Sequence, residues 1–218
     1  PTRKSIQLDL FPSEVMEGVV VQKSYSPDLP ASFAGGTVLL KSKSYPQEFF
    51  YKISTSTGMR TDTTFEDGYT YDGGGTDWLG YDDGTRELPA KVPGSDLGDL
   101  DLSSGELEEI GESFANTYDV DKETVYPDMG FSFSMGDSYR PGVNEYGYLA
   151  AVRYEQDWKT IDRDYKTFDA NGNTVHDKDQ KWTDRNIDIA GFLNFGAKLG
   201  TNHDISNTLM LIRSATDT

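Results

Sequence analysis

The sequence has no cysteine, no long apolar run and few basic residues for its length. Without cysteine the chain can form no disulfide, no thiol nucleophile and no cysteine-based zinc site. No segment approaches the roughly 18 uninterrupted apolar residues of a membrane-spanning helix, which excludes a helical membrane protein. The 37 acidic residues outnumber the 20 basic ones, giving a net charge of −17 that argues against a nucleic-acid partner.

A hydrophobic content of 35% over 218 residues is low for a water-soluble core of this size. It is compatible with a transmembrane β-barrel, whose strands hide their apolar residues in alternation with polar ones. The first twenty residues contain neither a charged start followed by an apolar stretch nor a small-residue cleavage site. We therefore expect both ends of the chain to continue in a longer protein.

The first 46 residues read as a small strand and turn arrangement. Alternation from Lys4 to Leu10 predicts a half-buried strand, and Pro12 to Met16 a helical turn. The β-branched run Val19 to Val21 predicts a strand buried on both faces, and Thr37 to Lys41 a further strand. These elements are too few for an independent globule, so they are expected to be part of a small α+β domain.

From Phe49 onwards the chain has long alternating segments. They predict five strands, over residues 49–59, 131–136, 146–158, 187–199 and 205–213. In the third, Tyr146, Tyr148, Ala150, Val152, Tyr154 and Trp158 share one face, with aromatic residues at both ends. At 45° tilt this segment rises about 28 Å, the height of the apolar band and aromatic girdles of an outer-membrane barrel. A strand in a soluble sandwich is usually about 5 to 6 residues long.

The connections between these strands alternate between long and short. The connection over residues 60–128 is very long, with one predicted helix at Leu102 to Phe114, and that over Asp169 to Thr183 is also long. The connections over Arg140 to Glu145 and Gly200 to Asp204 are short. Because outer-membrane barrels have long extracellular loops and short periplasmic turns, the first strand is expected to run outward from a periplasmic domain.

Four segments resemble TonB-dependent outer-membrane receptors. SYSPDLPASFAGGTVLLKSKSYP (24–46) is similar to the end of their plug domain, where a glycine pair precedes an apolar strand and a lysine junction into the barrel. GGGTDWLGYDDGTRELP (73–89) is similar to a first extracellular loop. YGYLAAVRYEQDW (146–158) and GTNHDISNTLMLIRSATDT (200–218) resemble the third strand and the fourth turn with its following strand. The junction residues are Gly35, Gly36, Lys41 and Lys43.

The resemblance implies a membrane β-barrel preceded by part of a plug. Residues 1–46 would be the C-terminal part of the plug, and residues 47–218 about five of the family's roughly twenty-two barrel strands. The implied protein is not an enzyme and needs no cofactor. It would lie in the bacterial outer membrane, in contact with lipid, and import a scarce small-molecule ligand. The TonB energy-transducing complex would act through a segment upstream of this chain.

Two groups of residues are candidates for ligand contact. The first lies in the long loop and combines aromatic surface with charge, which suits capture of a polar ligand; it comprises Asp77, Trp78, Tyr81, Asp82, Asp83 and Arg86. The same residues could instead fold the loop through an Asp–Arg pair and a buried Trp. The second group could line the permeation path or form wall charges against the plug; it comprises Arg153, Glu155, Asp157, Asp188 and Lys198.

A calcium-like segment and the two histidines are weaker candidates for a functional site. DANGNTVHD (169–177) has the alternating oxygen side chains of a calcium loop, but Thr174 replaces the required glycine and Gln180 the bidentate glutamate. A hairpin turn built on Asn-Gly is therefore favoured. His176 and His203 are the only histidines and lie in separate predicted turns, which disfavours a zinc or catalytic role.

Two further functions stay open at this stage. One is a soluble extracellular carbohydrate-binding β-sandwich that holds a sugar through Trp78 and Tyr81. The other keeps the outer-membrane barrel but makes it a scaffold for other envelope proteins. No nucleophile and base pair is recognisable, and Gly73 to Gly75 lacks the lysine and helix of a phosphate-binding loop.

Overall fold

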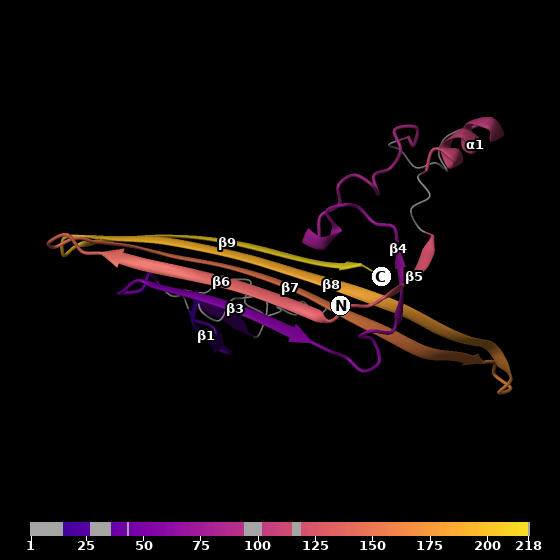
Figure 1. The fold of residues 1–218 in the computed structure, drawn as a ribbon, viewed down its shortest axis with the longest axis horizontal. Coiled ribbons are helices and arrows are strands. Elements are labelled where there is room, and N and C mark those ends of the chain that lie inside the picture. The colour runs from indigo at the N-terminus through magenta and orange to yellow at the C-terminus, as the bar shows by residue number, and fades with distance from the viewer. Residues whose placement is uncertain (1–14, 27–35, 43, 94–101, 115–118, 218) are drawn as a thin grey trace. The chain divides into compact units, whose positions relative to one another are not determined.

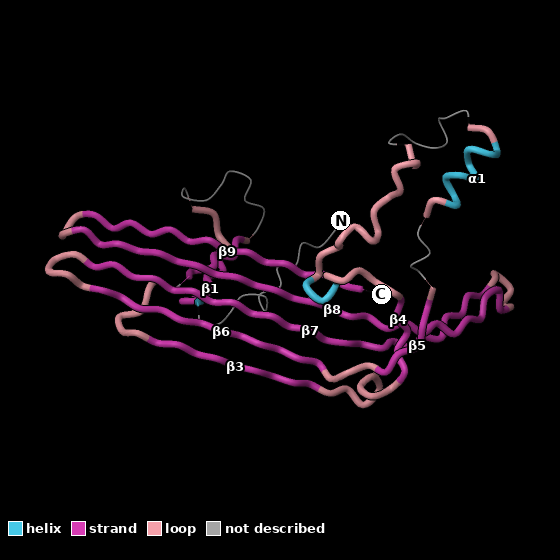
Figure 2. The backbone as a smooth tube through the Cα atoms, turned by 45° about the horizontal axis from the view of Figure 1, so that its top comes forward, coloured by secondary structure: helices cyan, strands magenta, loops and turns pink. Residues whose placement is uncertain are grey.

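The computed structural model describes residues 15–26, 36–42, 44–93, 102–114 and 119–217, which are mostly antiparallel β-sheet. The largest sheet has five strands in the order β3-β6-β7-β8-β9, drawn side by side in Figures 1 and 2. The bounds are β3 Phe50–Gly58, β6 Asp128–Tyr139, β7 Glu145–Phe168, β8 Thr174–Leu199 and β9 His203–Asp217. All five strands expected from alternation are therefore confirmed. The sheet is open, with β3 and β9 as its edges among the described strands.

Strand register gives the two faces of this sheet opposite character. On one face, Ile53 pairs with Phe133 and Phe133 with Val152, while Tyr51, Met135 and Ala150 are aligned one pair further along. On the other face the aligned residues are small or polar: Ser54, Ser132 and Arg153, then Lys52, Ser134 and Ala151. Ile53 is 61% exposed, whereas Ser134 is 3% exposed. At β6 and β7 the sheet thus exposes apolar side chains and covers small ones such as Ser134 and Ala151, whereas Lys52 and Ser54 on the edge strand β3 are exposed.

The N-terminal part of the chain covers the small and polar face. Val15 is fully buried in a cluster with Leu149, Ala151 and Phe192. Tyr45 lies against two strand glycines, where an added Cβ would be 2.1 Å from its ring at Gly147 and 2.3 Å at Gly196. Glycine is required at both positions because a side chain there would occupy the space of the tyrosine ring.

The first two described strands form a separate antiparallel pair. β1 (Met16–Gln22) pairs with β2 (Thr37–Ser42), with Val19 opposite Leu40. The two strands are as expected, but the predicted burial of Val19 to Val21 is wrong, because all three side chains are exposed. A two-stranded ribbon has no second layer to cover both faces. The predicted strand from Lys4 to Leu10 and most of the turn at Pro12 lie outside the described residues.

The chain divides into two compact units. Unit 1 comprises residues 1–58, 128–156 and 188–214, and unit 2 comprises residues 59–127, 157–187 and 215–218. Unit 2 contains the long connection between β3 and β6. Within it, β4 (Asp67–Tyr71) pairs with β5 (Val120–Thr124), a pairing that the sequence did not predict. It also contains the short helix η3 (Asp77–Leu79).

The expected helix of this connection is present as α1 (Ser104–Glu112). Its start is fixed by a capping box, in which the Ser103 hydroxyl accepts from the Glu106 N–H and the Glu106 carboxylate accepts from the Ser103 N–H. Ile110 is its buried residue. Four of its nine residues are glutamates, and most of this short helix is exposed to water.

The prediction of a long loop over Asp169 to Thr183 is wrong. Strands β7 and β8 continue to Phe168 and from Thr174, which leaves a tight hairpin turn between them. Asp169 Oδ1 accepts from the N–H groups of Asn171 and Asn173, both at 2.8 Å, and Gly172 has a φ of 83°. This confirms the hairpin interpretation of the Asn-Gly segment. No helix among the described residues is long and apolar enough to cross a membrane.

Candidate functional site

The loop that follows β4 is folded around two carboxylates and three consecutive glycines. The Gly74 N–H donates to Asp77 Oδ2 at 2.8 Å, and the Gly75 N–H donates to Asp83 Oδ2 at 2.7 Å. A Cβ at Gly73 would lie 2.0 Å from Asp77 Oδ2. The glycine run therefore permits carboxylates to approach the backbone at a distance that no other residue allows.

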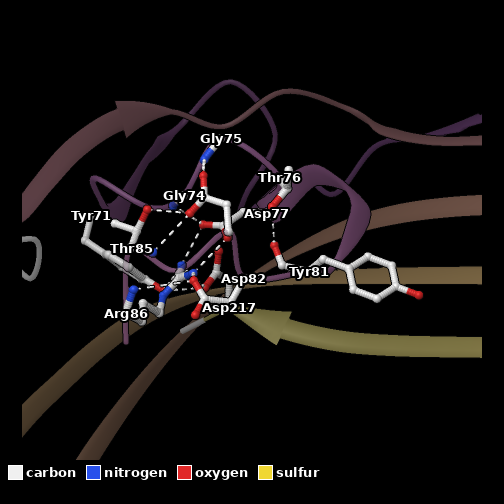
Figure 3. A network of polar contacts seen from close by, with 11 residues as sticks. Tyr71, Gly74, Gly75, Thr76, Asp77, Tyr81, Asp82, Thr85, Arg86 and Asp217 are labelled. Atoms are coloured by element: carbon white, nitrogen blue, oxygen red, sulfur yellow. Dashed lines mark hydrogen bonds and ion pairs between the residues drawn. The ribbon is translucent and has the colours of Figure 1, made fainter. Parts of the chain in front are cut away.

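Arg86 is the centre of a polar network in this loop, shown in Figure 3. Its guanidinium forms a two-pronged ion pair with Asp77, with Nη1 to Oδ1 at 2.8 Å and Nη2 to Oδ2 at 2.6 Å. Nη2 also donates to the Tyr71 hydroxyl at 2.7 Å, and the guanidinium lies 5.2 Å from the centre of the Tyr71 ring. The Tyr71 hydroxyl in turn donates to Asp217. Residues 146 positions apart in the sequence are thereby joined.

The network shifts the titration of its members. The hydrogen bonds from Arg86 lower the pKa of Asp77, and the same ion pair raises the pKa of Arg86. Burial, followed by the hydrogen bond to Asp217, raises the pKa of Tyr71. Hydrogen bonds from Thr85 and from the Gly75 N–H lower the pKa of Asp83. The loop thus holds both carboxylates in their charged form.

The six residues of the predicted loop site divide into two groups. Asp77, Asp83 and Arg86 fold the loop, with Asp82 more distant at 3.5 Å from Arg86. The interpretation that an Asp–Arg pair folds the loop is confirmed. The expected burial of the tryptophan is wrong, because Trp78 is 52% exposed. The Tyr81 ring also points away from the network in Figure 3, while its carbonyl accepts from the Thr76 hydroxyl.

A pocket of about 220 Å³ opens beside this loop, within unit 2. Its aromatic walls are Tyr69, Tyr71, Trp78 and Trp158. Its charged walls are Asp77, Glu123, Arg185 and Asp217. Aromatic walls with a few charged groups are the usual lining of a small-ligand site, and the volume suits one chemical group of a larger ligand.

The sequence did not predict this use of Trp158. We expected it on the apolar face at the end of a membrane-spanning segment, but it lines the pocket and lies under Arg185, whose guanidinium is 5.3 Å from the ring centre. Arg185 and Asp217 come from segments far along the chain, so no local motif indicated them. A second hollow, of about 850 Å³, shares Tyr69, Tyr71 and Thr183 with the pocket.

The five residues expected along the permeation path are not gathered into one site. Arg153 and Glu155 form an ion pair at 2.6 Å. Asp157, in unit 2, accepts from Asn186 at 3.2 Å and lies 3.7 Å from Arg60. Asp188 has one buried oxygen without a hydrogen bond to the described residues, and Lys198 is exposed. Two of the five are therefore paired with each other, and Asp157 is paired with Arg60 and Asn186.

The remaining predicted positions are the possible metal ligands, the two histidines and the four junction residues. Within the described ranges, no group of three or more His, Asp or Glu side chains could hold a metal ion. His176 lies on β8 and His203 at the start of β9, and both are exposed. Of the four junction residues, Lys41 pairs with Gly18 and Gly36 precedes β2, while Gly35 and Lys43 lie outside the described residues.

Comparisons of the chain with protein-family models, with curated proteins and with solved structures return no match.

Proposed function

We propose that this chain is part of a TonB-dependent outer-membrane receptor that binds a scarce ligand outside the cell and imports it. The observation that carries the proposal is the inverted distribution of side chains on the five-stranded sheet. Ile53, Phe133 and Val152 are aligned on an exposed face, while Ser54, Ser132 and Arg153 are aligned on the opposite face. A sheet that faces lipid on one side and a polar interior on the other requires this arrangement.

The exposed apolar face extends across the whole sheet. It continues on β8 and β9, where Phe195, Ile205, Leu209 and Leu211 are all more than half exposed. A water-soluble protein would cover such a surface, because contiguous exposed apolar patches of this extent cause association. Contact with acyl chains accounts for the exposure without a further protein layer. This argument disfavours the soluble carbohydrate-binding module.

The N-terminal segment supports the plug interpretation. Val15 and Tyr45 pack on the face of the sheet that carries small and polar residues, which would be the interior of a barrel. Filling of a wide barrel by a preceding domain is typical of the large outer-membrane transporters. In this proposal, residues 1–46 end the plug, residues 47–218 begin the barrel, and the TonB complex acts on the plug from the periplasm.

Strand lengths support an orientation. β7 and β8 have 24 and 26 residues, whereas a tilted strand needs only about 9 to 11 residues to cross the bilayer. The excess residues, 157–168 of β7 and 174–187 of β8, belong to unit 2, and the other ends of the two strands have the short turns after Tyr139 and Leu199. Outer-membrane barrels extend on the extracellular side. Unit 2 would therefore lie outside the cell, where it can meet a ligand.

The proposal is tested by placing a charge on each face of the same strand in the full-length protein. Arginine at a lipid-facing position near the bilayer centre costs about 2–4 kcal/mol, whereas a lumen position tolerates it. Ile53→Arg should therefore lower the urea midpoint and reduce the folded protein recovered in the outer membrane. Ser54→Arg, also at an exposed position, is the matched control and should change little.

Equal behaviour of the two variants would contradict the proposal, because an exposed isoleucine in water tolerates arginine as well as its serine neighbour does.

A measurement of ligand uptake then distinguishes a transporter from a scaffold. Deleting the TonB-interacting segment of the full-length receptor should abolish ligand import. If the variant still assembles with envelope proteins and no import is ever detectable, the scaffold alternative is favoured.

A further inference from the structure

Three consecutive strands of the five-stranded sheet each have a glycine where the N-terminal segment approaches most closely. At Gly147 on β7 and Gly196 on β8, an added Cβ would lie 2.1 Å and 2.3 Å from the Tyr45 ring. At Gly136 on β6 it would lie 2.8 Å from the Pro46 ring. All three distances are too short for a real Cβ atom, so these glycines form a socket that Tyr45 and Pro46 fill.

The backbone around this socket restricts how Tyr45 can move. The ring of Pro46 fixes its own φ angle and disfavours the helical region for the residue before it, so both residues have few backbone conformations. The next residue is also held, because the Ser138 hydroxyl donates to the Gln47 carbonyl at 3.0 Å. Strand β3 then begins at Phe50. The socket therefore holds the chain where the N-terminal segment ends and the sheet begins.

The Tyr45 side chain is held by its shape and not by its hydroxyl. The hydroxyl oxygen is buried and forms no hydrogen bond with any residue that the structure describes. Because a buried hydroxyl without a partner has lost its hydrogen bonds to water, it favours the state in which the ring has left the socket. The ring itself favours the docked state, because docking removes a large apolar surface from water. Tyrosine therefore docks less tightly than phenylalanine would at this position.

The rest of the N-terminal segment covers the same face of the sheet. Val15 is fully buried in a cluster that includes Leu149 and Ala151. These two residues lie two and four positions after Gly147 on β7, so alternation places all three on one face. Ala151 is 7% exposed. Water reaches it from this face only when the segment that carries Val15 moves away.

We propose that Tyr45, Pro46 and the three glycines form a reversible catch, which holds the N-terminal segment against the sheet and releases when that segment is pulled. The catch requires only contacts within unit 1, whereas the pulling rests on the proposed function, in which the TonB complex acts on the plug. Strand β3 lies beyond the catch and is paired with β6 from Phe50 to Gly58. Release therefore frees the residues before Tyr45 and leaves the sheet intact.

Docking is tested by the rate at which a buried thiol reacts. Ala151→Cys in the full-length protein, with any cysteine outside this chain replaced, gives a single thiol beneath the N-terminal segment. A water-soluble maleimide modifies this thiol only in molecules whose segment has lifted, so the rate reports the open fraction. Adding Tyr45→Phe should slow the modification at least about fivefold, because no unpaired hydroxyl is then buried. Adding Tyr45→Ala or Gly196→Ala should accelerate it at least about tenfold.

Two matched variants separate the catch from general effects on the sheet. Tyr139→Phe removes the hydroxyl of a tyrosine that is 70% exposed, and Gly191→Ala adds a Cβ whose nearest atom is 3.9 Å away. Neither should change the rate by more than about twofold. The catch is overturned if Tyr45→Phe reacts as fast as its parent or faster, and equally if Tyr45→Ala leaves the rate unchanged.

Release under force is measured by pulling single molecules of the full-length protein in lipid bilayers from a point upstream of Pro1. We expect a rupture event when the extended length reaches residue 45, at higher force in Tyr45→Phe and missing in Tyr45→Ala. A trace of the unchanged protein without this event overturns release by pulling.

The outcome for Ile53→Arg keeps the two proposals separate. Thiol protection that depends on Tyr45, in a protein whose Ile53→Arg variant is unimpaired, refutes the membrane receptor and leaves the docked catch intact. A lipid-facing sheet whose thiol at position 151 reacts equally in all Tyr45 variants refutes only the catch.

Discussion

The two units of the chain differ sharply in charge. Unit 1 contains 11 acidic and 10 basic residues, a net of −1, while unit 2 contains 26 acidic and 10 basic residues, a net of −16. Almost the whole charge of the protein is therefore in the unit that carries the aromatic pockets. Because like charges repel one another, this acidity should lower the stability of unit 2 and not that of unit 1.

The units are also held together by different interactions. Unit 1 relies on close packing, in which Val15 and Tyr45 fit against small residues of the sheet. Unit 2 relies on a polar network centred on Arg86. Packing tolerates little change of volume but is insensitive to pH, whereas an ion-pair network depends on the protonation of its carboxylates. Each unit should therefore respond to a different perturbation.

The largest expected effect is on the loop of unit 2. Asp77→Ala removes both hydrogen bonds of the Arg86 guanidinium to its main partner and leaves that charge partly buried, which costs about 2–3 kcal/mol. We expect faster amide exchange at Gly74 and Gly75, with unit 1 unaffected. Asp82→Ala is the matched control, because its carboxylate is 3.5 Å from Arg86 and more exposed. Similar exchange in both variants would show that the ion pair does not hold the loop.

A smaller effect is expected in unit 1. Gly147→Ala places a methyl group 2.1 Å from the Tyr45 ring, and overpacking of this kind costs about 1–3 kcal/mol. The urea midpoint of the full-length protein should fall. Gly191→Ala is the control on β8, since the nearest atom to its added Cβ is 3.9 Å away. If Gly147→Ala is as stable as Gly191→Ala, Tyr45 does not anchor the N-terminal segment.

The smallest effect is a pH dependence of the loop. The pKa values of Asp77 and Asp83 are lowered in the folded loop, so their contribution is present above the unfolded value near 3.9 and is lost as pH falls through the lowered values. Amide exchange in residues 72–86 should therefore increase below about pH 4, in advance of exchange in the β6 and β7 strands. Simultaneous loosening of both regions would argue against a separate polar network.

Local patterns predicted the strands and the helix well. Alternation at Tyr51 and Ile53 and again at Phe131 and Phe133 indicated both the strand type and its two faces, because a period of two is a direct consequence of strand geometry. The Ser103 and Glu106 capping box marks the start of α1. These features depend on neighbours in the sequence, so they can be recognised without the fold.

Long-range features were not predictable in the same way. The pairing of Asp67–Tyr71 with Val120–Thr124 joins segments about fifty residues apart, and neither has a strong alternation. The outer parts of β7 and β8 are rich in charge, so they resemble a loop although their backbones pair in the sheet. The candidate loop residues were identified, but Tyr71, Arg185 and Asp217 join the site only through tertiary structure.

The most direct test of a lipid-facing sheet is to measure whether each face of β6 is exposed to lipid or to water. The chain has no cysteine, so a single thiol can be introduced in turn at each position from Phe131 to Gly136 and labelled with a nitroxide. In the full-length protein in lipid bilayers, labels at 131, 133 and 135 should collide with oxygen and be protected from a water-soluble nickel complex, while labels at 132, 134 and 136 should collide with oxygen less. Accessibility to the nickel complex at 131, 133 and 135 would contradict a lipid-facing sheet.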